Sequence, residues 1–153
     1  MGFMFRGIHL LSMDAKGRIK IPTRHLGQVT KICSGQMVMS IHPDDPCLVL
    51  YPLKDWQQLE LKIGELPSLN VHTKKLSRKL IGHALECELD KIGRILIPSS
   101  HKNYANLNNK AILSGQGKSF EIWDERAWKD QIEKLERLSN QAEVPQEISK
   151  LSL

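Results

Sequence analysis

The sequence has no apolar run approaching the roughly eighteen residues that a membrane-spanning helix needs, because Lys, Asp, His or Pro interrupts every apolar stretch. It also has little cysteine: the three thiols are widely spaced, form no Cys-x-x-Cys pair and follow no secretory leader. These absences predict a soluble, cytoplasmic protein with reduced thiols at Cys33, Cys47 and Cys87.

Catalytic and metal-binding motifs are missing as well. The sequence has no nucleophile elbow, no phosphate-binding glycine loop and no His-Glu-x-x-His pair. Structural zinc typically takes four ligands from closely spaced pairs, which do not occur here. We therefore expect no enzymatic activity, no metal and no other cofactor.

The 153 residues allow one domain or two small ones. A composition of 41% hydrophobic and 25% charged residues is typical of a folded globular protein. The formal net charge of +5 favours an anionic partner such as nucleic acid, although many enzymes are equally basic.

An internal repeat is the strongest pattern in the chain. The segment 14–22 (DAKGRIKIP) recurs 76 residues later as 90–98 (DKIGRILIP). A second similarity, at an offset of 72, joins residues 47–56 (CLVLYPLKDW) to residues 119–128 (SFEIWDERAW). We interpret the chain as a tandem duplication of a unit of about 50 residues.

Each copy is expected to fold as a hairpin, a short helix, a strand and a longer helix. The Asp-x-x-Gly-Arg stretch predicts a turn, because Asp14 and Asp90 can accept hydrogen bonds from nearby amides while Gly17 and Gly93 can adopt a positive φ. In the strand 18–21 the side chains alternate between charged and apolar, so the two isoleucines are expected to face a core. A short helix capped by threonine is expected to follow.

The same alternation predicts a cationic face. Arg18 and Lys20, with Lys16 in the turn and Arg24 beyond the strand, place positive charge on one side of a hairpin. A two-stranded ribbon fits the DNA major groove, where Arg pairs with guanine and Lys contacts phosphate. The second copy keeps Arg94 but has leucine at the position of Lys20, so the first copy is expected to make the main sequence-specific contacts with DNA.

Other interpretations of these residues stay open. Arg18 can simply pair with Asp14 and brace the turn. His25 and His101 recur three residues after a proline, which indicates a shared structural role. The basic cluster Lys74, Lys75, Arg78 and Lys79 is either ordinary solvated surface or a phosphate-contacting patch. The apolar stripe Trp128, Ile132, Leu135 and Leu138 is either core or an interface with a partner.

Several motifs occur together with the two turns: MFRG at 4–7, GHA at 82–84 and EIWD at 121–124. Together they resemble the MraZ family of bacterial transcriptional regulators over nearly the whole chain. The resemblance implies a mixed, mainly β fold with peripheral helices (α+β), in which duplicated SpoVT-AbrB-like swapped-hairpin units form a pseudo-twofold β-barrel. We expect unit 1 at 8–55, a helical connector at 56–83, unit 2 at 84–127 and a C-terminal helical segment at 128–153.

The resemblance also implies a function. The family binds tandem promoter boxes on double-stranded DNA as a ring-shaped homo-oligomer, upstream of the division and cell-wall gene cluster that includes its own gene, in the nucleoid. Its DNA-contacting turns fall on 14–18 and 90–94. The family commonly has Arg at the position of Lys102, so a point charge replaces a planar fork here. It usually begins at the MFRG string, so residues 1–3 reflect a start-site choice or an added remnant.

A function of another class is an antitoxin-like interaction module, because AbrB-type folds also grip partner proteins. An antitoxin usually carries one such unit and a disordered tail, whereas this chain has two units and an ordered-looking end.

Overall fold

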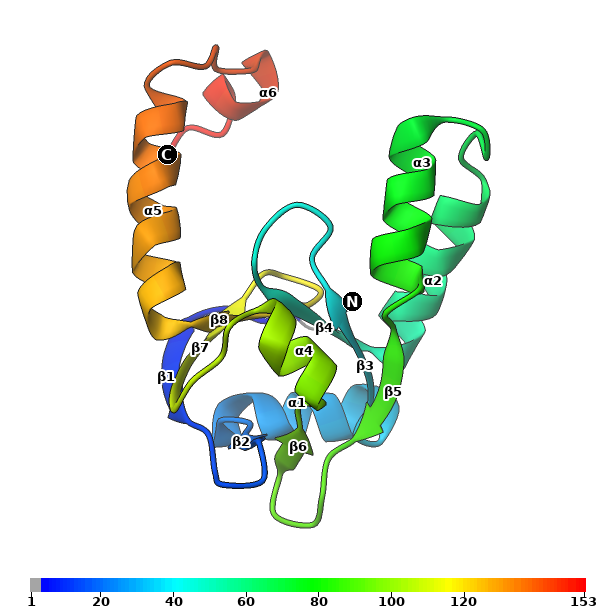
Figure 1. Ribbon diagram of the computed structural model, residues 1–153. Coiled ribbons are helices and arrows are strands. Elements are labelled where there is room, and N and C mark those ends of the chain that lie inside the picture. The colour runs from blue at the N-terminus through cyan, green and yellow to red at the C-terminus, as the bar shows by residue number, and fades with distance from the viewer. Residues whose placement is uncertain (1–3) are drawn as a thin grey trace.

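The computed structural model describes residues 4–153, so residues 1–3, on which the question of the start site falls, lie outside its described part. Within the described range, eight strands and six α-helices form a mixed α+β fold that is mainly sheet (Figure 1). The fold class expected from the sequence is confirmed at this level.

The two halves of the chain have the same order of elements. The first half contains β1 (Ile8–Ser12), β2 (Arg18–Lys20), α1 (Thr23–Cys33), β3 (Gln36–Ile41), β4 (Leu48–Pro52) and α2 (Leu53–Gly64). A helix α3 (Val71–Leu76) and a π-helical turn η1 (Ser77–Ile81) follow. The second half contains β5 (Leu85–Glu88), β6 (Arg94–Leu96), α4 (Ser99–Tyr104), β7 (Lys110–Gly115), β8 (Phe120–Asp124), α5 (Glu125–Ser139) and the short α6 (Gln146–Ser149).

Proline and aspartate set the helix starts. Pro22 stands at the N-cap of α1 with φ −54°, so threonine is the first helical residue there and not the cap that the sequence analysis expected. The helix ends at Ser34, which has a left-handed φ of 55°. At α5 the Asp124 carboxylate accepts hydrogen bonds from the amides of Arg126 and Ala127.

The strands form one six-stranded sheet in the order β1-β7-β8-β4-β3-β5 and a separate two-stranded ribbon of β2 and β6. All pairings are antiparallel and four of them join the two halves: β1 with β7, β2 with β6, β3 with β5, and β4 with β8. Among residues 4–153 the sheet is open, with edges at β1 and β5, and no closed barrel is detected. The barrel expected from the family resemblance is therefore not confirmed.

The ribbon packs on the inner face of the sheet. Ile19 and Ile95 lie opposite each other in the ribbon and are fully buried in the main core, together with sheet residues such as Leu50 and Leu113. Two backbone hydrogen bonds of 2.9 Å fasten the copies together, from the Ile21 amide to the Gly93 carbonyl and from the Ile97 amide to the Gly17 carbonyl.

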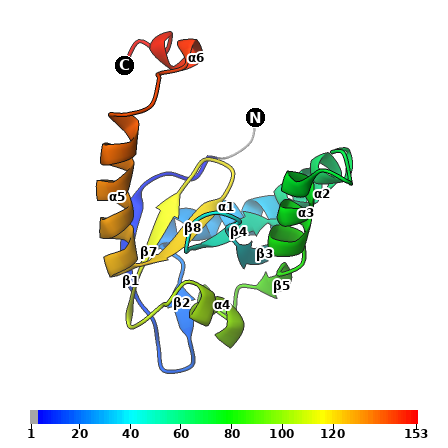
Figure 2. The ribbon, with the colours of Figure 1, turned by 45° about the horizontal axis from the view of Figure 1, so that its top comes forward.

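Two helical arms cover separate parts of the outer face. Val38 and Val49 pack with Trp56 of α2 and Leu80 of η1, while Trp123 of β8 packs with Trp128 of α5. Figures 1 and 2 show α5 and the α2–α3 pair at opposite lateral ends of the sheet, and the ribbon with its turns lies at the bottom of Figure 1, away from both arms. In the range 4–153, no helix has the length and apolarity needed to cross a membrane.

Candidate nucleic-acid interface

The first turn is built around one aspartate. Oδ1 of Asp14 accepts hydrogen bonds of 2.9 Å from the amides of Lys16 and Arg18. Gly17 has φ 85°, a conformation that side chains rarely tolerate. Hydrogen bonding by the Arg18 amide is the main reason that the pKa of Asp14 lies below its usual value. The carboxylate is therefore charged at neutral pH and holds the turn closed.

The second turn repeats this construction. Oδ1 of Asp90 accepts hydrogen bonds from the amides of Ile92, at 3.0 Å, and Arg94, at 2.8 Å. Gly93 also has φ 85°, and the pKa of Asp90 is lowered by the same kind of amide contact from Arg94. The turn chemistry is thus the same at both positions.

Each turn aspartate also binds an arginine. Nε of Arg18 donates to Oδ2 of Asp14 at 2.7 Å, and Nε of Arg94 donates to Oδ2 of Asp90 at the same distance. Nη1 of Arg94 lies 4.0 Å from the Asp14 carboxylate, so the second copy's arginine reaches the first turn. The bracing interaction left open in the sequence analysis is present, and it uses Nε.

Bracing leaves part of the Arg18 guanidinium for other contacts. In the described chain no hydrogen bond involves its Nη1 or Nη2, although an arginine carries five N–H donors. A guanidinium that is fixed through Nε presents these terminal nitrogens in a defined orientation.

The ribbon register brings the predicted cations of both copies together. Arg18 lies opposite Leu96, and Lys20 lies opposite Arg94. Because the central isoleucines point into the core, these four side chains share the outward face. Lys20 and Leu96 are exposed, and no ion pair or side-chain hydrogen bond of residues 4–153 involves the Lys20 ammonium.

The other two predicted cations lie elsewhere. Lys16 is exposed in the first turn, next to the ribbon. Arg24 is exposed in the first turn of α1, and its charge acts on His9 of β1. The structure thus groups Arg18, Lys20 and Arg94 on one face and does not place Arg24 in that group.

Two lysines of the basic cluster at 74–79 contact other parts of the fold. Lys75 forms an ion pair with Asp44 of the β3–β4 loop, and Lys79 Nζ donates to the Pro43 carbonyl at 2.9 Å. The Lys79 ammonium also lies 5.8 Å from the centre of the Tyr104 ring. At least these two lysines hold a loop, which is a role that their spacing in the sequence does not indicate.

The recurring histidines are buried. His25 is 1% exposed and its Nε2 lies 3.1 Å from Nε2 of His9, while its Nδ1 lies 3.1 Å from the Gln28 amide oxygen. His101 is 3% exposed and its Nε2 donates to the His83 carbonyl at 2.8 Å. Both side chains are buried and hydrogen-bonded within the fold, although their partners differ. Sequence reasoning missed His9, since no local pattern joins it to a residue sixteen positions away.

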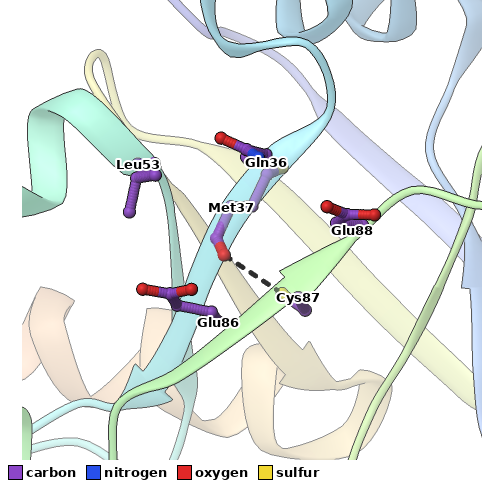
Figure 3. A pocket seen from close by; sticks show the side chains of 6 residues that line it. All are labelled: Gln36, Met37, Leu53, Glu86, Cys87 and Glu88. Atoms are coloured by element: carbon purple, nitrogen blue, oxygen red, sulfur yellow. Dashed lines mark hydrogen bonds between the residues drawn. The ribbon is translucent and has the colours of Figure 1, made fainter.

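A cavity of about 270 Å³ lies beside β5, and Figure 3 shows its lining. Cys87 is directed toward the backbone of β3, where its Sγ lies 3.6 Å from the Met37 carbonyl. Burial raises the pKa of the Cys87 thiol to about 12, so it carries no nucleophilic thiolate at neutral pH. No group of three or more possible metal ligands occurs within residues 4–153.

Known proteins with similar sequences define the class first: they are transcriptional regulators. The proteins named Transcriptional regulator MraZ from Alkalilimnicola ehrlichii and Pseudomonas aeruginosa are each 43% identical to this chain, over 150 and 151 residues, covering 98% of it and 100% of their own length. The Methylococcus capsulatus protein of the same name is 48% identical over 125 residues, 82% of either chain.

The family model of the MraZ protein, described as antitoxin-like, matches residues 4–79 and again residues 80–149. The chain belongs to the MraZ family.

Proposed function

We propose that this regulator binds double-stranded DNA with the outward face of its β2–β6 ribbon. The contacting residues are Arg18, Lys20 and Arg94, with Lys16 at the rim and Arg24 as a peripheral phosphate contact; Asp14, Gly17, Asp90 and Gly93 shape the turns. The targets are tandem promoter boxes upstream of the division and cell-wall gene cluster that includes the protein's own gene. The protein acts in the cytoplasm at the nucleoid, without a cofactor and without enzymatic activity.

One observation carries this proposal: Lys20 lies directly opposite Arg94 on an exposed face. Like charges at directly opposed positions destabilise a strand pair, so the ribbon gains nothing from this arrangement by itself. Arg94 is paired with Asp90, whereas Lys20 has no carboxylate partner among residues 4–153, and a DNA phosphate can supply the negative charge that Lys20 lacks. Arg18, oriented by Asp14, can then offer its terminal nitrogens to a guanine edge in the major groove.

We further propose that the halves are SpoVT-AbrB-like units with swapped hairpins and pseudo-twofold symmetry, at 8–55 and 84–127, with a connector at 56–83 and a C-terminal segment at 128–153. The reciprocal pairings of β1 with β7 and β5 with β3 support the swap. A closed barrel would additionally require the edge strands β1 and β5 of the open sheet to be joined.

Assembly into a ring is part of the same proposal. Ile132, Leu135 and Leu138 continue the α5 stripe beyond its contact with the sheet and are 44 to 50% exposed. A second copy that covers this stripe would bury it, and a closed ring would join several DNA-binding ribbons. Tethering of this kind raises avidity by roughly 10² to 10⁴, so affinity should rise steeply with the number of boxes.

The test is a fluorescence anisotropy titration with DNA from upstream of the gene and with scrambled DNA, at several salt concentrations. We expect preferential binding that weakens steeply with salt and is lost on Arg18→Ala in a folded protein. Lys134→Ala, which removes one charge from exposed α5, is the control and should bind normally. Loss of binding on Arg94→Ala with normal binding by Arg18→Ala would overturn the first copy's leading role.

The second candidate is an antitoxin-like interaction module, favoured by the exposed α5 stripe and by the match to a family described as antitoxin-like. Equal, weak binding to both DNAs would favour this candidate, with α5 as the surface that grips a protein.

A further inference from the structure

Lys102 of α4 reaches the first turn from the second copy. A Cβ placed on Gly17 would lie 2.8 Å from Nζ of Lys102 and 3.3 Å from its Cε. The missing side chain of the glycine therefore leaves the space that the lysine's charged end occupies. The first turn consists of residues of one copy and an ammonium of the other.

The second turn has the same geometry with different chemistry. A Cβ on Gly93 would lie 2.7 Å from Cδ2 of Leu26, which belongs to α1 of the first copy. Leu26 and Lys102 are equivalent positions, since they are separated by the repeat offset of 76 residues. One turn thus receives a cation from the opposite copy and the other receives an apolar side chain.

The Lys102 ammonium does not serve the fold through an ion pair. In the described chain, the ion pairs of Asp14 involve Arg18 and Arg94, and none involves Lys102. Leucine fills the equivalent space at the second turn, which shows that an apolar side chain is enough for packing. The positive charge at this position therefore has no structural counterpart in the repeat.

We propose that Lys102 is a DNA phosphate contact that the second copy supplies to the first turn. Together with Lys16 and Arg18 it makes the first turn the more cationic of the two, while Leu26 keeps the second turn apolar at the same point. This inference rests on the proposed DNA-binding function. It attributes the difference in positive charge between two similarly built turns to one lysine.

The test compares Lys102→Leu, Lys102→Arg and Arg18→Ala in the anisotropy titration with upstream DNA. Lys102→Leu reproduces the natural partner of the second turn, so the fold should accept it, and circular dichroism checks this. We expect about five- to tenfold weaker binding near 0.1 M salt and a salt slope that is smaller by about 0.9, the value of one phosphate contact. Lys102→Arg should keep both the affinity and the slope.

A gain-of-charge variant provides the reciprocal test. Leu26→Lys places an ammonium at the second turn and should increase the salt slope by about 0.9. Unchanged affinity and slope in Lys102→Leu, with binding lost in Arg18→Ala, would refute the role of Lys102 and leave the proposed function intact. Normal binding by both variants, or no DNA binding by the wild type, would refute the proposed function and this inference with it.

Discussion

Replacing Lys20 with threonine should separate stability from DNA binding. Lys20 is exposed and faces the like charge of Arg94 across the ribbon. Removing a like-charge pair and adding a β-branched residue each favour an exposed strand by a few tenths of a kcal/mol, so Lys20→Thr should raise the free energy of unfolding by about 0.5 kcal/mol. For a chain of this size the melting temperature would rise by about 1 to 2 °C. DNA affinity near 0.1 M salt should fall about five- to tenfold.

Urea unfolding and the anisotropy titration, carried out on the same preparations, measure the two effects. Arg94→Thr serves as the comparison, because it removes the same repulsion but also breaks the bond to Asp90, and it should destabilise the ribbon. A Lys20→Thr protein destabilised by more than about 1 kcal/mol would show that Lys20 supports the fold, and the argument from opposed charges would fail.

Three further outcomes are expected. Burial, with smaller electrostatic effects of His25 and Arg24, lowers the pKa of His9, so the unfolded chain takes up this proton more readily. The free energy of unfolding should therefore be highest above about pH 6.5 and decline below it, and less so in His9→Gln, by urea titration between pH 5 and 8. Leu135→Glu should reduce the oligomer size in sedimentation velocity without loss of helix signal, and an unchanged size would exclude the α5 stripe from assembly. Gly93→Ala, at φ 85°, should cost about 1 to 2 kcal/mol in thermal melts, whereas Gly27→Ala, with open space inside α1, should stabilise; equal effects would contradict the strain argument.

The turns could be predicted from sequence because their chemistry is local. An aspartate that accepts bonds from amides two and four residues later, and a glycine at positive φ, depend on residues within one short segment. The alternation in 18–21 likewise predicted that Ile19 of β2 and Ile21 just after it are buried. The Asp124 cap of α5 follows from the same kind of local rule.

Long-range contacts could not be predicted in this way. Nothing in the sequence indicates that Lys20 meets Arg94, because register between strands 74 residues apart is fixed by the core beneath them. The contact of Lys102 with the first turn and the ion pair of Lys75 with Asp44 depend on how whole elements pack. The sequence pattern predicts one strand between the short and long helices of each copy, but two are present there, because β3 precedes β4 and β7 precedes β8.

Hydrogen exchange with mass spectrometry, in the presence and absence of upstream DNA, tests the central claim most directly. We expect upstream DNA, but not scrambled DNA, to slow amide exchange in residues 14–20 and 90–96. Exchange in α5 should be the same with either DNA. Binding of upstream DNA with slowed exchange on the α2–α3 arm or α5, and none in the ribbon, would contradict the account.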